Sequence, residues 1–126
     1  MMEKENGIGI FVWTKHSQAK MRQYMLSENR VKRVIRNPLR VEEGIAPKTL
    51  ASMQKAGSKK HPYEIWVMYV IENSKLKTQN SKFKKGRRIK VISAWKYPGV
   101  THPGEPIPIP PDIFEEIIKF IDVGRR

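Results

Sequence analysis

The hydrophobic and polar positions divide the chain into short strand-like and helix-like stretches. Residues 7–13 are β-branched and aromatic and are followed by Thr14, which predicts an edge strand. Residues 15–26 contain no Gly or Pro, and their apolar side chains recur at three- and four-residue spacing. This spacing predicts an amphipathic helix, with Thr14 as its N-cap.

Ser27 is a suitable cap for a second helix, which the pair Asn37-Pro38 ends. Residues 39–46 alternate loosely between apolar and polar side chains, which favours a second strand. Residues 47–62 are expected to form a connection, within which residues 49–56 favour a short helix.

The longest apolar run lies at residues 63–71 and predicts a central strand that is covered on both faces. Residues 72–88 are polar and basic, as in a long solvated hairpin loop. Residues 89–97 form the returning strand, and their alternation places Trp95 and Tyr97 on the same face.

Residues 98–111 hold most of the prolines and predict a stiff, extended strap. Asp112 precedes Glu115 by three residues, which is the capping-box spacing, and residues 113–121 carry a broad apolar stripe. A third helix is therefore expected here, with Asp112 as its cap.

The expected order is strand, helix, helix, strand, strand, strand, helix, which is an α+β fold. Two N-terminal helices would pack on one face of a small antiparallel sheet, and the C-terminal helix or a partner would cover the other face. We expect one domain over residues 1–97, with residues 98–126 as a strap and helix packed on it or on a partner.

The charge of the chain predicts a polyanionic partner. Lys and Arg number 25 against 12 Asp and Glu, a formal charge of +13. Residues 15–40 hold eight of these cations and one acid, and residues 75–90 hold eight cations and no acid. The alternative is a solvated helix face and an exposed loop. The candidate phosphate contacts are Lys15, Arg22, Lys84, Lys85, Arg87, Arg88, Lys90 and Lys96.

Several classes of site are excluded by composition. The absence of cysteine excludes disulfides and thiolate zinc sites, and the three histidines lack the spacing of metal ligands. There is no Gly-rich phosphate loop and no Gly-x-Ser-x-Gly motif, so neither metal nor cofactor is expected.

No apolar run approaches the roughly 20 residues that span a bilayer, and the acidic start is unlike a signal peptide. A cytoplasmic protein is expected.

His16, Lys20 and Tyr24 share one face of the first predicted helix. Metal-free RNA cleavage needs a base for the 2′-hydroxyl, an acid for the departing 5′-oxygen and cations at the phosphorus, and these side chains can supply all three. The alternative is that His16 locks the helix to the sheet.

Trp95 and Tyr97, beside Lys96, could stack on bases; the alternative for Trp95 is core packing.

The stretch from Thr14 to Pro38 reads TKHSQAKMRQYMLSENRVKRVIRNP. It resembles the opening of a family of small bacterial and phage domains of unknown function grouped with the RelE/ParE toxin superfamily. The spacing from His16 to Pro38 agrees, whereas two arginines of the family fall on Lys20 and Tyr24 here and its glycine falls on Met25. The likeness extends over roughly residues 8–97, which leaves out the strap and the last helix.

The resemblance implies two helices on one side of a small antiparallel sheet. It also implies relatives that include toxins cutting mRNA without metal, some only on the ribosome, and gyrase poisons. The other sheet face would then hold RNA or an antitoxin peptide.

The leading hypothesis is a RelE-like, metal-independent ribonuclease, either a toxin or a relative of one. His16 would act as acid or base, and Tyr24 or Tyr97 would assist. The cations at the phosphate would be Lys20, Arg87, Arg88 and Lys90. One alternative is a non-catalytic module that binds RNA or DNA. Another is a protein-interaction domain that docks through residues 113–121. Ribosome-bound RNA, an antitoxin or other protein, and a second copy in a homodimer all remain candidate partners.

Overall fold

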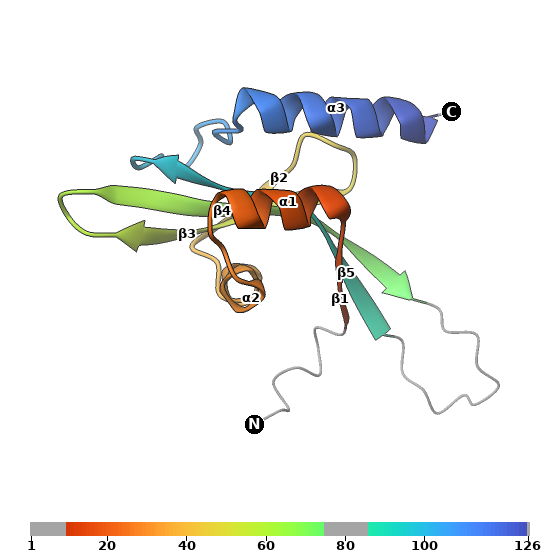
Figure 1. Cartoon of the computed structure of the whole chain (residues 1–126), viewed down its shortest axis with the longest axis horizontal. Coiled ribbons are helices and arrows are strands. Elements are labelled where there is room, and N and C mark those ends of the chain that lie inside the picture. The colour runs from red at the N-terminus through yellow and green to blue at the C-terminus, as the bar shows by residue number, and fades with distance from the viewer. Residues whose placement is uncertain (1–9, 75–85, 126) are drawn as a thin grey trace.

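The computed structural model describes residues 10–74 and 86–125, which form an α+β fold with five strands and three helices (Figure 1). The strands are β1 (Ile10–Trp13), β2 (Arg40–Glu43), β3 (Thr49–Gly57), β4 (Pro62–Ser74) and β5 (Gly86–Pro98). The helices are α1 (Lys15–Gln23), α2 (Glu28–Arg36) and α3 (Pro111–Arg125). Among the described residues, no helix is long and apolar enough to cross a membrane.

The strand order in the sheet is β1-β5-β4-β3-β2. β1 runs parallel to β5, and the other neighbours are antiparallel. The sheet is therefore mixed, whereas the sequence predicted an antiparallel one. β4 lies at its centre, as expected from the long apolar run, and β1 forms one edge.

The prediction of a short helix at residues 49–56 is wrong, because β3 occupies this stretch. It pairs with β4 along its whole length, from Thr49 opposite Val70 to Gly57 opposite Pro62. Leu, Ala, Met, Gln and Lys are good helix formers, but the pairing with β4 and the burial of Ala51 override that weak local preference.

The two N-terminal helices begin at their expected caps. Thr14 Oγ1 accepts a hydrogen bond from the Ser17 backbone N–H at 3.0 Å, and Ser27 Oγ accepts one from the Arg30 N–H at 3.0 Å. The third helix differs by one residue, because it begins at Pro111 and places Asp112 inside its first turn. Proline suits this first position because a backbone N–H there would have no acceptor within the helix, so its absence costs no hydrogen bond.

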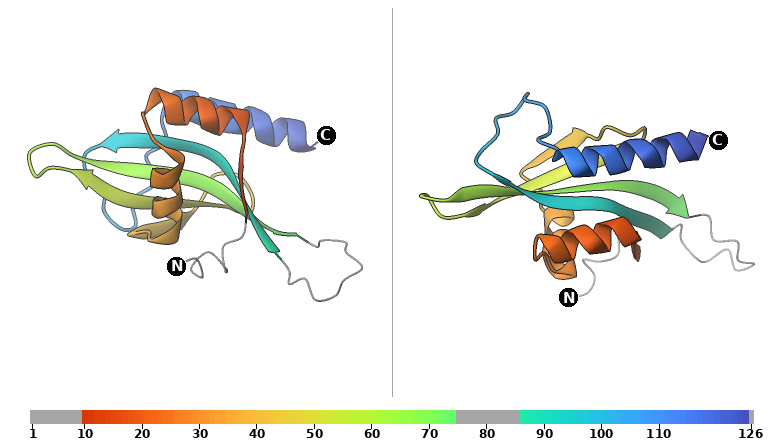
Figure 2. Two further views of the ribbon diagram at one scale, coloured as in Figure 1. Left: turned by 60° about the horizontal axis from the view of Figure 1, so that its bottom comes forward. Right: turned by 45° about the horizontal axis from the view of Figure 1, so that its top comes forward.

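Helices cover both faces of the sheet (Figure 2). On one face, Val31 and Val34 of α2 pack with Ile65, Val67 and other residues of β4 and β5. On the other face, Ile113 and Ile117 of α3 pack with both buried tryptophans of the central strands. The face that the sequence left open is thus covered by the chain itself, and the α3 residues that face the sheet are not available to dock another chain.

A β-bulge changes the alternation expected along β5. Met68 pairs with Ser93 but Tyr69 pairs with Val91, so that Ile92 is the extra residue. Val91 joins the core under α1 and α2, whereas Ile92 and Trp95 join the core under α3. The prediction that residues 89–97 alternate without interruption is therefore wrong at this point.

A buried polar network ties the strap to the sheet. The fully buried Glu64 carboxylate accepts hydrogen bonds from Trp66 Nε1 at 2.9 Å and from the Thr101 N–H at 2.7 Å. Arg40 donates to Thr101 Oγ1 at 2.6 Å and lies over the Trp66 ring, 5.2 Å from its centroid. Further along the strap, Trp95 Nε1 donates to the carbonyl of Pro108 at 2.9 Å. Arg40 also donates to the Glu105 carbonyl at 3.2 Å, so these bonds hold the strap at Thr101, Glu105 and Pro108.

Candidate nucleic-acid interface

His16 lies where the first turn of α1 meets β5. Thr14 Oγ1 donates to the Val91 carbonyl at 3.0 Å, and this bond holds the start of the helix against the strand. A hydrogen bond of 3.0 Å joins His16 Nε2 to Ser93 Oγ. The imidazole borders a cavity of about 90 Å³ whose far side is formed by Glu116 and Ile117 of α3. Ligand pockets usually measure about 300–1,000 Å³, so this cavity is too small for a nucleotide.

The surroundings of His16 lower its pKa. Burial is the main cause, because it disfavours the charged imidazolium, and the Lys20 charge acts in the same direction. The Glu116 and Asp112 carboxylates oppose the shift. The shift favours the neutral imidazole, and its bond to Ser93 also suits the alternative role of locking α1 to the sheet.

Lys20 and Tyr24 are engaged in packing and pairing. Lys20 Nζ forms an ion pair with Asp112 and a hydrogen bond of 2.9 Å with Gln23 Oε1, and only 14% of its side chain is exposed. The same ammonium lowers the pKa of Asp112, chiefly through their hydrogen bond. Tyr24 is half-buried between the two cores. His16 and Lys20 lie in α1, whereas Tyr24 is its C-cap, and Lys20 serves as a link between α1 and α3.

The aromatic residues predicted at the end of β5 do not form a stacking site. Trp95 is fully buried, and its ring stacks on that of Trp66 with centroids 6.4 Å apart. Burial therefore corrects its assignment as a base-stacking residue in favour of core packing. Tyr97 is half-buried and lies four positions along the strand from Ser93, about 13 Å at the usual rise. The structure does not bring it to His16.

The predicted phosphate contacts are dispersed over several elements. Lys15 and Arg22 are exposed on α1, and Arg87 and Arg88 are exposed on β5. Arg88 Nε lies 3.8 Å from Glu72 Oε1. The remaining candidates divide as follows: Lys90 is half-buried, Lys96 lies 5.2 Å over the Tyr63 ring, and Lys84 and Lys85 lie outside the described residues.

A set of residues that the sequence reasoning missed lies where β1 meets α2. The Phe11 and Trp13 rings stack with centroids 5.9 Å apart and an interplanar angle of 17°. Lys32 Nζ lies 5.3 Å from the Phe11 centroid, and Arg36 Cζ lies 5.6 Å from it. Phe11, Trp13 and Lys32 are half-buried and Arg36 is exposed. We call these four residues the β1–α2 surface.

Two local signals for this surface are present in the sequence. Phe11 and Trp13 are two positions apart in a strand, so they share a face, and Lys32 and Arg36 are four apart in a helix, so they also share a face. Their meeting depends on how α2 packs against the sheet, which no local pattern specifies.

Charge is segregated between the two sides of the molecule. Residues 15–36, which include α1 and α2, hold seven Lys and Arg and one acid. Residues 98–118, which include the strap and the first half of α3, hold four acids and no Lys or Arg. These segments lie on opposite sides of the sheet (Figure 2). A polyanion is therefore attracted more strongly to the side of α1 and α2 than to the other.

We compared the chain with protein-family models, with curated proteins and with solved structures. None of the three comparisons gives a match. The resemblance to the RelE/ParE superfamily accordingly stays a prediction.

Proposed function

We propose that the domain binds single-stranded nucleic acid through the β1–α2 surface. The observation that carries this proposal is the position of Lys32 and Arg36 over Phe11, whose ring stacks on that of Trp13 at an edge of the sheet. Proteins that bind single strands combine aromatic rings, which stack on bases, with cations that follow the backbone. The other cations of α1 and α2 extend the attraction beyond these four residues.

Each component of the surface has a role in this proposal. Bases would stack on Trp13 and on the guanidinium plane of Arg36, with about 1–3 kcal/mol for each stacked base. Lys32 would contact phosphate as a point charge. RNA is the strand to test first, because the resemblance of residues 14–38 points to RNA-directed relatives.

Fluorescence anisotropy with a labelled single-stranded RNA of about 12 nucleotides tests the proposal. We expect Lys32→Gln/Arg36→Gln to weaken binding about tenfold and to reduce the slope of log affinity against log salt by about 1.4. The matched control is Lys59→Gln/Lys60→Gln, which removes two exposed charges from the turn between β3 and β4. Equal losses in the two double variants would show that only net charge matters and would overturn the proposal.

Metal-independent RNA cleavage at His16 is a second candidate function. The observation that favours it is a neutral imidazole whose Nε2 lies 3.0 Å from a hydroxyl, an arrangement that can take up or relay a proton. Against it, Lys20 is paired with Asp112 rather than available for phosphate.

The test is incubation of end-labelled RNA in EDTA, alone or on ribosomes. This candidate requires cleavage by the wild type and by His102→Ala, whose histidine is exposed in the strap, but not by His16→Ala. Intact RNA in every reaction would leave binding as the function.

A further inference from the structure

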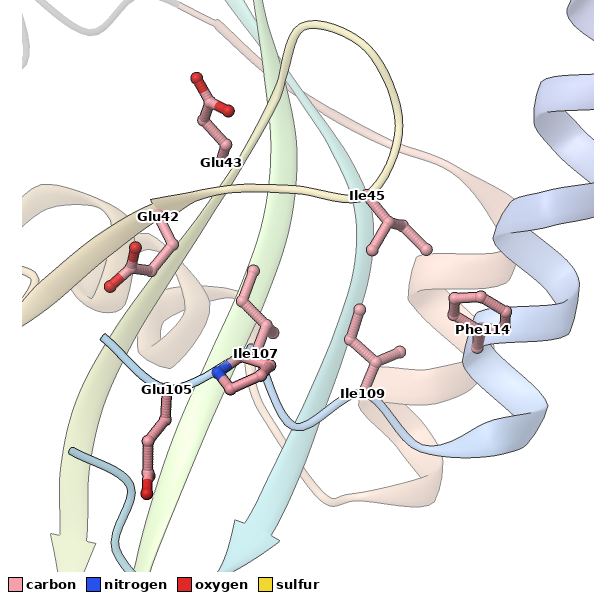
Figure 3. A pocket seen from close by; sticks show the side chains of 8 residues that line it. Glu42, Glu43, Ile45, Glu105, Ile107, Ile109 and Phe114 are labelled. Carbon is pink, nitrogen blue, oxygen red and sulfur yellow. The ribbon is translucent and has the colours of Figure 1, made fainter. Parts of the chain in front are cut away.

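A groove on the acidic side of the molecule lies between the β2–β3 connection, the strap and the start of α3 (Figure 3). Its volume is about 550 Å³, within the range of ligand sites. Glu42, Glu43 and Glu105 line one part of it, and Ile45, Ile109 and Phe114 line the other. No Lys or Arg is among the residues that line the groove.

The three carboxylates keep a net negative charge in the groove. Glu42 Oε2 pairs with Arg40 at 2.9 Å, which compensates one of the charges. Glu105 Oε1 accepts the His102 backbone N–H at 2.7 Å, which orients the carboxylate, and its Oε2 lies 3.8 Å from His102 Nδ1. Glu43 is exposed. Phosphate is therefore repelled here and a cationic side chain is attracted, although the chain as a whole carries +13.

The apolar part of the groove presents surface that the fold does not cover. Phe114 is 45% exposed although it lies in the first turns of α3, next to the fully buried Ile113. Ile45 and Ile109 are half-buried and point toward Phe114 (Figure 3). An aliphatic side chain placed among them would bury apolar area on both partners.

The walls of the groove are preorganised. The strap is held by the hydrogen bonds from Arg40 to Thr101 and from Trp95 to Pro108, at 2.6 and 2.9 Å. The opposite wall continues from β2, an edge strand that pairs with β3 alone. An open site between an edge strand and an extended strap suits an extended peptide. Because the walls are already ordered, binding costs them little conformational entropy.

We propose that this groove binds an extended segment of a partner protein in which a Lys or Arg lies close to a large aliphatic side chain. The cation would meet Glu43 and Glu105, and the aliphatic side chain would pack on Phe114. Charge complementarity and the apolar lining together select this occupant. The proposal does not depend on nucleic-acid binding, because the groove and the β1–α2 surface share no residue.

Anisotropy of a fluorescein-labelled peptide with alternating Lys and Leu tests the proposal at about 150 mM salt. We expect saturable binding that Glu43→Gln/Glu105→Gln weakens about fivefold, since partly exposed ion pairs each make only a modest contribution. Phe114→Ala should weaken it at least about threefold. The control Glu115→Gln, exposed on α3 outside the groove lining, should leave the affinity unchanged.

Two further probes separate the contributions of charge and apolar area. A peptide with Glu in place of Lys should not bind, and one with Ser in place of Leu should bind more weakly. Unchanged near-ultraviolet circular dichroism will show that each variant keeps its fold. RNA affinity should be the same in Glu43→Gln/Glu105→Gln as in the wild type, which separates this test from that of the β1–α2 surface.

The proposal is overturned if the Lys-Leu peptide does not saturate below about 1 mM, or if Glu115→Gln weakens it as much as the groove variants do. Sedimentation supplies another contradicting result. Self-association that Glu43→Gln/Glu105→Gln abolishes, without any peptide binding by the wild type, would assign the groove to a second copy of the chain.

Discussion

His16 Nε2 and Ser93 Oγ are 3.0 Å apart, and their hydrogen bond joins the first turn of α1 to the bulged part of β5. Ser93 is fully buried, and the imidazole is partly so. Because burial favours the neutral ring and lowers the pKa of His16, the burial of this side chain makes the stability of the fold depend on pH.

We expect the free energy of unfolding to fall as the pH is lowered below 6.5, the ordinary pKa of histidine. The folded pKa of His16 is lower, so the unfolded chain binds the proton more tightly and stability is lost until the pH passes below the folded value. Urea unfolding of the wild type and of His16→Gln between pH 7.5 and 5 measures this effect. His61→Gln, at an exposed turn, is the control. The same pH slope in His16→Gln as in the wild type would contradict the assignment.

The ion pair between Lys20 and Asp112 links α1 to α3 across the sheet edge. Because 54% of the Asp112 side chain is exposed, we expect Asp112→Asn to lower the free energy of unfolding by no more than about 1 kcal/mol. The pKa of Asp112 is lowered, so this contribution is present above the ordinary value of 3.8 and lost as the pH falls through the folded value. Urea titrations with and without about 1 M salt should show that screening removes the difference. A loss that persists in salt would point to a packing role.

Removing one donor from the buried Glu64 should be costly. Thr101→Val keeps the shape of the side chain but deletes the hydroxyl that links Glu64 to Arg40. Because two buried charged groups each lose a partner, we expect a loss of about 1–3 kcal/mol. Urea unfolding measures the loss, and limited proteolysis should detect loosening of the strap. A loss below about 0.5 kcal/mol would mean that water replaces the hydroxyl.

Substitutions of Trp95 and Trp13 should affect different properties, the first the free energy of unfolding and the second the affinity for RNA. Trp95→Ala is expected to cost about 3–5 kcal/mol of unfolding free energy, since the ring is fully buried against Trp66. Trp13→Ala should cost less, because its ring is half-buried, but should weaken RNA binding by about 1–3 kcal/mol. The milder Trp95→Phe gives a folded comparison in the anisotropy assay. Equal RNA affinities in Trp13→Ala and Trp95→Phe would contradict the β1–α2 surface.

The parts of the fold that local chemistry determines were predicted from the sequence. Thr14 and Ser27 cap their helices because a side-chain oxygen can satisfy an orphan N–H within three residues. The central strand and the strap follow from an apolar run and from prolines. β3 was missed because its composition favours a helix until β4 pairs with it, and the bulge at Ile92 depends on the register of two strands.

The candidate site was predicted less well than the fold, because its contacts join residues that are far apart in the sequence. The sequence placed His16 on the correct helix. It could not show that Lys20 forms an ion pair with Asp112, which lies far along the chain. It left Trp95 between base stacking and core packing, and packing in the sheet buries that ring. Phe11 and Arg36 come together only through the packing of α2 against the sheet.

The charge segregation across the sheet gives the protein a permanent dipole moment directed through its thickness. If the β1–α2 surface binds nucleic acid as proposed, the field of that polyanion would turn the α1–α2 side toward it before contact and raise the fraction of productive encounters at low ionic strength. The acidic groove then faces away from the polyanion and stays accessible to a cationic partner. The sheet would then separate two partners of opposite charge, a nucleic acid on the α1–α2 side and a cationic peptide on the side of the groove.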